Sequence, residues 1–274
     1  MEDPLKSAKA SVALVSDIIK AAGDNPNVRE AGNNLGQAAL TLTKTINNVL
    51  LPLAALNFAV EKARVYFDTK FALELAEKAS KIPPKDIVEP KATIAGPALQ
   101  GLAFSHEEKS LRDMYLNLLA TAMDGRLAIE AHPAFVEIIK QLDGEEARLL
   151  PEFLQPDTFV AIAQVRETNS YGHGYAIVSN YLVNFKENGE PVLVPRGAAM
   201  VDNWIRLGLL KADYERHLIA SHDNYHWVET RPEYKDLLEQ ARISNCTLSY
   251  EKGMIWRTAF GAQFAHAVGM QGEH

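Results

Sequence analysis

The chain has 274 residues, of which 47% are hydrophobic and 23% are charged, so its composition is globular and its length allows two ordinary domains. The net charge of −7 divides into about −3 before Pro151 and about −4 after it, and neither half has the basic surface that nonspecific duplex binding needs. A single cysteine, Cys246, excludes an intramolecular disulfide and any Cys-x-x-Cys zinc or redox motif. The first residues, MEDPLKSAKASVALV, lack the layout of a signal peptide, so we expect no export by the usual route.

Residues 1–82 are predicted to form an N-terminal helical region that contains a segment of very low charge. Between Ala31 and Val60 the only charged residue is Lys44, and the other polar residues are uncharged Asn, Gln and Thr. Such a segment could be an amphipathic membrane span inside an oligomer or a buried helical hairpin, because both require few charges. The residues predicted to form the membrane or pore segment are Asn47, Asn48, Leu50, Leu53, Leu56 and Phe58.

Beyond Val60 the charged residues return, and an apolar stripe predicts a helix that lies in water along one face. The stripe consists of Val65, Phe67, Phe71, Leu75 and Ala79. Four prolines between residues 83 and 97 then predict an extended linker, which leads into a helix that starts near Pro97.

Residues 83–150 are predicted to form a helical core with the most regular pattern in the chain. Helical spacing predicts one helix through Leu111, Met114, Tyr115, Leu118, Leu119 and Ala122. Pro133 suits the first position of a second helix, since its missing N–H would have no partner there. Asp143 and Glu146 have the spacing of a capping box, which predicts that a third helix begins at this point.

The sequence of these predicted helices resembles the abortive-infection alpha family, a group of bacterial proteins associated with defence against phage. The resemblance covers RDMYLNLLATAMD and AHPAFVEIIKQLDGEEARLL, about forty residues in all. The matching positions are Tyr115, Leu118, Leu119, Ala120, His132, Pro133, Phe135, Ile138, Gln141, Leu142, Glu145, Glu146 and Leu149. The resemblance implies a role in anti-phage defence without a reaction, because no catalytic residue is assigned to this motif.

After Leu150 the pattern changes to short elements, and we predict a winged-helix-like α+β domain over residues 151–274. FVAIAQV could be a buried strand or a helical turn, AIVSNYLVNF favours a strand, and KENGEP indicates a hairpin or loop. A helix over 195–208, followed by the strand-like runs LKADYERHLIAS and YHWVETRPEY, has the order of a winged helix. KDLLEQARI predicts a further helix, and the last part of the chain a strand and a helix.

The second half is rich in side chains that stack on bases and pair with phosphates. The predicted ligand-binding residues are Trp204, Arg206, Arg216, His217, Tyr225, Trp227 and Arg231. Because this half is acidic overall, we expect the ligand to be a nucleotide or a short single-stranded oligonucleotide. The alternative is that the aromatic residues fill the core.

Known catalytic motifs are absent from the sequence, so we expect no catalytic residue, no cofactor and no enzyme activity. His222 and His226 are four residues apart, but they match no known zinc-ligand spacing, and we expect no metal site.

We therefore predict a mainly α fold with a smaller α+β part, in which an N-terminal helical bundle or hairpins precede a winged-helix-like domain. The predicted function is an oligomeric abortive-infection effector at the bacterial inner membrane, which forms a pore or channel and is restrained or triggered by a ligand. The alternative is a soluble, cytoplasmic module that binds nucleic acid or protein. The expected partners are further copies of the chain and a companion defence protein.

Overall fold

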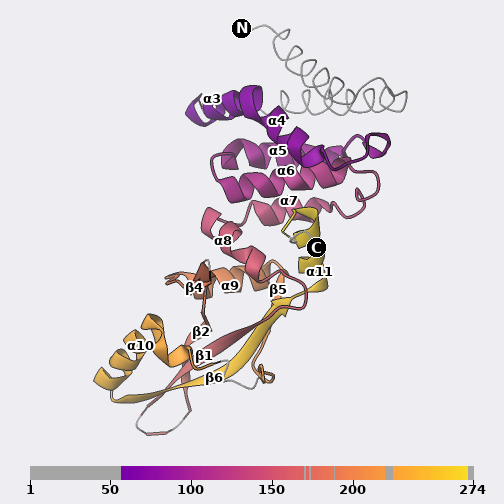
Figure 1. The fold of residues 1–274 in the computed structure, drawn as a ribbon. Coiled ribbons are helices and arrows are strands. Elements are labelled where there is room, and N and C mark those ends of the chain that lie inside the picture. The colour runs from indigo at the N-terminus through magenta and orange to yellow at the C-terminus, as the bar shows by residue number, and fades with distance from the viewer. Residues whose placement is uncertain (1–56, 170, 173, 188, 220–224, 271–274) are drawn as a thin grey trace. The chain divides into compact units, whose positions relative to one another are not determined.

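The computed structural model describes residues 57–169, 171–172, 174–187, 189–219 and 225–270 (Figure 1). The chain divides into two compact units. Unit 1 is Met1–Arg148 with His266–Met270, and unit 2 is Leu149–Ala265 with Gln271–His274.

The described part of unit 1 is helical. Its elements are α3 (Asn57–Tyr66), the π-helix η2 (Phe67–Phe71), α4 (Ala72–Ala79), the short 3-10 turn η3 (Pro84–Asp86), α5 (Ala92–Ser105), α6 (Lys109–Met123), α7 (Pro133–Ile139) and α8 (Gly144–Leu149). The core lies around α6, where Tyr115, Leu118 and Leu119 are fully buried. The predicted apolar face of this helix is therefore confirmed.

Two predicted details of the preceding helices are wrong. Val65 is 53% exposed, although it was placed in the buried stripe, while its neighbour Tyr66 is buried. Val65 and Phe67 are two residues apart on a continuous helix and point in nearly opposite directions, and Phe67 is the one that is buried. In addition, α5 begins at Ala92, and Pro97 lies inside it. The carbonyl of Thr93 that Pro97 cannot bond lies near the helix start at an exposed residue, where water can reach it.

The predicted capping box is confirmed at the start of α8. Asp143 Oδ1 accepts hydrogen bonds from the backbone N–H groups of Glu145, at 3.0 Å, and Glu146, at 2.9 Å. Glu146 Oε2 in turn accepts from the backbone N–H of Asp143 at 2.9 Å. These reciprocal bonds satisfy N–H groups that have no partner within the helix.

The C-terminal residues of unit 1 are bonded to α6. Asn117 Nδ2 donates to the carbonyl of Val268 at 3.0 Å, and Thr121 Oγ1 donates to the carbonyl of Ala267 at 3.0 Å. His266 and Glu130 form an ion pair close by. The helix α6 thus binds residues 267–268, which lie almost 150 residues further along the chain.

Unit 2 contains a four-stranded antiparallel sheet that curls into a half-barrel, with the strand order β2-β1-β6-β5. The strands are β1 (Phe159–Asn169), β2 (Ala176–Val183), β5 (Leu210–Asp213) and β6 (Cys246–Arg257). The pairing of β1 with β6 is unbroken over its whole length, from Phe159 opposite Trp256 to Asn169 opposite Cys246. These two strands form the long twisted ribbon in Figure 1.

Short elements surround this sheet. They are η4 (Leu150–Glu152), β3 (Lys186–Glu187), β4 (Glu190–Pro191), α9 (Gly197–Arg206), η5 (Val228–Thr230), α10 (Pro232–Ile243) and α11 (Ala259–Ala267), which ends in unit 1. Side chains of η5 and α10 pack on one face of the sheet, where Val228 and Tyr234 meet Ala163, Val165 and Leu182. The structure confirms the strand predicted for AIVSNYLVNF, the hairpin predicted for KENGEP and the helix predicted for KDLLEQARI.

The fold is thus mixed α/β, and the predicted winged helix is not what these residues form. The run YHWVETRPEY was predicted to be a strand, but it forms turns, η5 and the start of α10. Tyr225 and Val228 are both buried and three residues apart, which suits a helical turn and not the alternation of a strand. The strand β5 pairs with β6, far along the chain, and residues 214–219, the described part of the run that follows β5, form no strand.

Within the described residues, no helix is long and apolar enough to cross a membrane. Five of the predicted pore residues lie outside the described residues, namely Asn47, Asn48, Leu50, Leu53 and Leu56. The sixth, Phe58, is the second residue of α3.

Candidate functional site

Unit 2 contains a cavity of about 320 Å³. Its lining residues are Glu152, Phe153, Phe159, Val160, Ala161, Asn184, Lys186, Leu218 and Trp227. They come from η4 and the residue after it, the start of β1, the residue after β2, the hairpin strand β3, the segment after β5 and the turn before η5. The volume lies in the range of sites for small organic ligands, and the lining combines aromatic walls with a few polar groups, as such sites do.

The aromatic walls are held by packing at their backs. Phe153 is buried, and its ring centroid lies 5.1 Å from that of Trp204 and 5.7 Å from that of Phe185. Phe159 is half exposed, and its ring lies 6.3 Å from that of Trp256 on the neighbouring strand. The cavity therefore has a rigid inner wall at Phe153 and an accessible aromatic face at Phe159.

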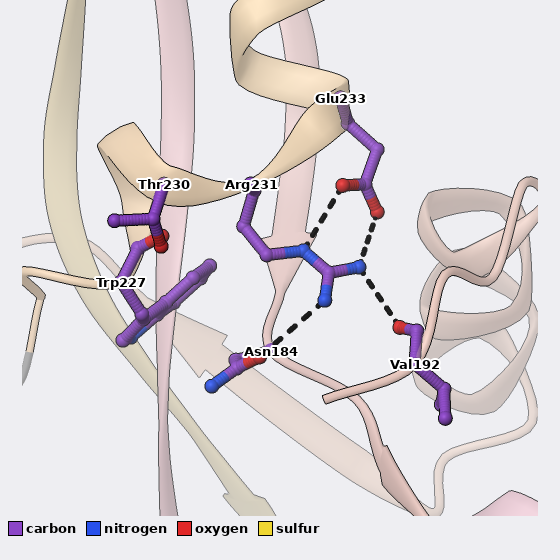
Figure 2. Close-up of polar contacts among 6 residues, drawn as sticks. All are labelled: Asn184, Val192, Trp227, Thr230, Arg231 and Glu233. Carbon is purple, nitrogen blue, oxygen red and sulfur yellow. Dashed lines mark hydrogen bonds and ion pairs between the residues drawn. The ribbon is translucent and has the colours of Figure 1, made fainter. Parts of the chain in front are cut away.

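A buried arginine lies behind the polar wall of the cavity (Figure 2). Arg231 makes two bonds to the carboxylate of Glu233, from Nε to Oε2 at 3.0 Å and from Nη2 to Oε1 at 2.5 Å. Nη2 also donates to the carbonyl of Val192 at 2.9 Å. Because Glu233 neutralises the guanidinium in place, Arg231 is a structural cation and is not free to pair with a phosphate.

Arg231 also touches the cavity lining through Asn184. Its Nη1 donates to Asn184 Oδ1 at 3.4 Å, and Figure 2 shows the amide nitrogen of Asn184 on the side away from the guanidinium. Asn184 follows the end of β2, so the sheet fixes its backbone while Arg231 fixes its side chain. The cavity thus receives an amide whose orientation is set from behind.

Two charged side chains complete the lining. Lys186 lies in β3 and Glu152 at the end of η4, and both are exposed. Lys186 brings a positive charge to the cavity and can pair with an anionic group of a ligand. Glu152 brings hydrogen-bond acceptors, which can receive N–H groups.

Further cations lie along the surface beside Phe159. Arg216 lies over the ring of Trp256 at 5.2 Å, and Lys211 lies 5.9 Å from the same ring. Arg216 Nε also donates to Asp213 Oδ2 at 2.7 Å, and this hydrogen bond lowers the pKa of the Asp213 carboxyl. One aromatic and basic surface therefore continues from the cavity across β1, β6 and β5.

Of the seven predicted ligand-binding residues, only Trp227 lines the cavity. Trp204 and Tyr225 are buried in the core of unit 2, as the alternative reading of these aromatic residues held. Arg206 bonds Asn203 on the surface of α9, at 2.6 Å. His217 is exposed, with its ring 6.3 Å from that of Tyr225.

The polar residues of the cavity were not predicted from the sequence. Asn184 and Lys186 stood at the edge of a predicted strand and in a predicted hairpin, and neither position carries a chemical signal of its own. Phe159 was part of an apolar run whose strand or helix character was open. Only the fold brings these three residues to Trp227, which is about forty residues further along than Asn184.

Among the residues that the structure describes, no three His, Cys, Asp or Glu side chains are grouped so that they could hold a metal ion. His222, which was considered as a ligand in the sequence, lies outside these residues.

Comparison with protein families matches residues 63–268 to the model for abortive infection alpha. The chain belongs to the abortive infection alpha family. The resemblance seen in α6, α7 and α8 is therefore confirmed, and the role in anti-phage defence follows from it. Neither a curated protein nor a solved structure matches the chain. All residues that line the cavity lie within the abortive infection alpha match, whereas the low-charge segment 31–60 precedes it.

Proposed function

We propose that this abortive infection alpha protein is an effector whose unit 2 binds a nucleotide or a short single-stranded oligonucleotide. The cavity of about 320 Å³ carries this proposal, because it combines aromatic faces, a cation and oriented polar groups in one place.

Each part of the lining suits one part of such a ligand. The rings of Trp227 and Phe159 can stack on a base, an interaction that every base can make. Lys186 can pair with a phosphate, and Asn184 and Glu152 can bond the polar edge of the base or the sugar. The ligand would be short, since the unit is acidic overall and cannot hold a long polyanion by charge alone.

A ligand site also fits what an effector of abortive infection needs. Such a protein must stay inactive until infection, and a ligand changes its state only if it binds one state better than the other. A nucleotide that appears on infection would supply this differential binding.

We propose further that the toxic step belongs to the low-charge segment 31–60, which would act on the inner membrane as part of a homo-oligomer. The support is the sequence, where Lys44 is the single charge among thirty residues. Fractionation of cells with and without detergent tests this step. Recovery of the protein as a monodisperse monomer without detergent would favour the alternative, a module that binds nucleic acid or protein without membrane activity.

Thermal denaturation with a panel of nucleotides and di- to tetranucleotides tests the ligand site. We expect at least one ligand to raise the melting temperature, and Trp227→Ala or Lys186→Ala to lose this shift. Arg206→Ala is the matched control, because Arg206 lies on α9 and not in the lining, and it should keep the shift. No shift with any ligand, or equal shifts in all variants, would contradict a nucleotide site in this cavity.

A further inference from the structure

We infer that Asn184 is a fixed hydrogen-bond donor that makes the cavity prefer bases with a carbonyl edge, uracil and guanine, over cytosine and adenine. This inference rests on the proposed nucleotide site and adds which bases the site accepts. It follows from the contact between Arg231 and Asn184 behind the cavity wall.

An asparagine amide normally presents a donor or an acceptor by rotating through half a turn, and Arg231 removes this choice. A guanidinium has only N–H donors, so the group that faces it must be the amide oxygen. The distance from Arg231 Nη1 to Asn184 Oδ1 is 3.4 Å. A rotated amide would place its NH₂ group against N–H donors and would lose this bond.

Arg231 itself is held too firmly to follow a rotated amide. The guanidinium is 5% exposed, and it is fixed by both oxygens of Glu233 and by the carbonyl of Val192. Figure 2 shows Glu233 on the opposite side of the guanidinium from Asn184, and Val192 next to Nη2. Glu233 and Arg231 are therefore positioning residues, which act on a ligand through Asn184.

The cavity side of Asn184 consequently presents NH₂. The O4 atom of uracil or the O6 atom of guanine accepts from this donor, whereas the amino group that cytosine or adenine carries at the same place would meet it donor to donor. Glu152 adds acceptors to the lining, and uracil and guanine carry a ring N–H beside the carbonyl that can donate to a carboxylate. A buried donor left without an acceptor weakens binding, so the wrong base is rejected.

Uridine and cytidine monophosphate give the sharpest test, because they share size and charge and differ at the edge of the base. Isothermal titration of the full-length protein should show UMP binding about tenfold tighter than CMP, the effect of one hydrogen bond of ordinary strength. Asn184→Asp keeps an oxygen for Arg231 and replaces the donor by an acceptor of the same shape. This variant should lose or reverse the preference. Asn169→Asp, at the exposed end of β1, is the matched control and should keep it.

The outcomes separate the two proposals. Equal binding of UMP and CMP by the unchanged protein would overturn the inference and leave the nucleotide site standing. A preference that persists in Asn184→Asp would also overturn it. Failure of any nucleotide to bind the unchanged protein would instead contradict the proposed function. If Asn184→Asp does not fold, the ratio of GMP to AMP affinity in the unchanged protein decides, and a ratio near one refutes the inference.

Discussion

Arg231 and Glu233 form a two-bond ion pair at the start of α10, with one partner almost fully buried and the other 25% exposed at its side chain. The pair connects the helix to the hairpin segment at Val192 and to the cavity wall at Asn184. The residue type of Arg231 predicted a contact with a ligand phosphate, but in the structure its charge is paired with Glu233 and its guanidinium holds the side chain of Asn184 in the cavity wall.

Replacing Glu233 should destabilise the fold, because Arg231 is buried with its charge. Glu233→Gln leaves the Arg231 charge without its counter-ion, and we expect a loss of about 1 to 3 kcal/mol in the free energy of unfolding, discounted for the partial exposure of Glu233. Urea denaturation measures it. Glu239→Gln is the matched control, since its pair with Arg242 is well exposed, and it should change stability by less than about 0.5 kcal/mol. Equal effects in the two variants would show that Arg231 is not buried with its partner.

The family motif helix should be equally sensitive at its core face. Leu118 is 0% exposed, so Leu118→Ala leaves a cavity and should cost about 2 to 5 kcal/mol. Leu73→Ala is the comparison on the surface, because Leu73 is 68% exposed, and it should cost less than about 0.5 kcal/mol. An unchanged melting temperature for Leu118→Ala would mean that the core face is misplaced.

A glycine in β6 makes room for a tyrosine of the segment after β5. A Cβ atom at Gly253 would lie 2.4 Å from the ring of Tyr214 and 2.7 Å from the backbone oxygen of Asp213. Gly253→Ala should therefore destabilise by about 1 to 3 kcal/mol through overpacking. Gly96→Ala, in α5 with nothing within 4 Å, should be neutral or stabilise by up to about 1 kcal/mol. Equal stabilities of the Gly253→Ala and Gly96→Ala variants would show that β5 and β6 do not pair as described.

Acid should weaken unit 1 through Asp124. Hydrogen bonds from Arg126 lower the pKa of this buried carboxyl below its ordinary value of 3.8. A lowered folded pKa means that the carboxylate stabilises the fold above pH 3.8 and that this contribution is lost as the pH falls through the lowered pKa. Arg126→Gln should therefore lose stability at pH 7 and show a smaller further loss as the pH falls below about 4, where the lowered pKa of Asp124 makes the unchanged protein lose this contribution. Lys235→Gln, on exposed α10, should keep the original acid profile.

The membrane step makes its own prediction. If segment 31–60 enters a bilayer, Leu53→Glu should abolish toxicity in cells while the protein still folds, because a charge at mid-span costs several kcal/mol. Circular dichroism and growth of cells that express the variant measure the two properties. Full toxicity of Leu53→Glu would count against insertion.

The sequence pattern predicted correctly those parts of the fold that depend only on residues close together in the chain. The capping box of Asp143 and Glu146 and the buried face of α6 need only residues within a few turns, and both were correct. The error at Val65 has a local cause too, because an apolar residue two positions before Phe67 cannot share its face of the helix.

The pairing of distant segments could not be predicted in this way. The end of β5 suggested a hairpin with the residues after it, yet the partner is β6, some forty residues further on. The cavity depends on such pairings, because Phe159, Asn184 and Trp227 meet only after the sheet and the turn before η5 have formed. Of the residues chosen by type, Trp227 lines the cavity, whereas Trp204 and Arg231 are buried, which only the fold decides.

The most direct test of the nucleotide site uses the protein purified from phage-infected and uninfected cells. We predict absorbance at about 260 nm above that of the aromatic residues in protein from infected cells, with the bound molecule identified by mass spectrometry and absent from Trp227→Ala. Protein from infected cells that shows only the absorbance of its aromatic residues, or a bound molecule that Trp227→Ala retains, would contradict the account.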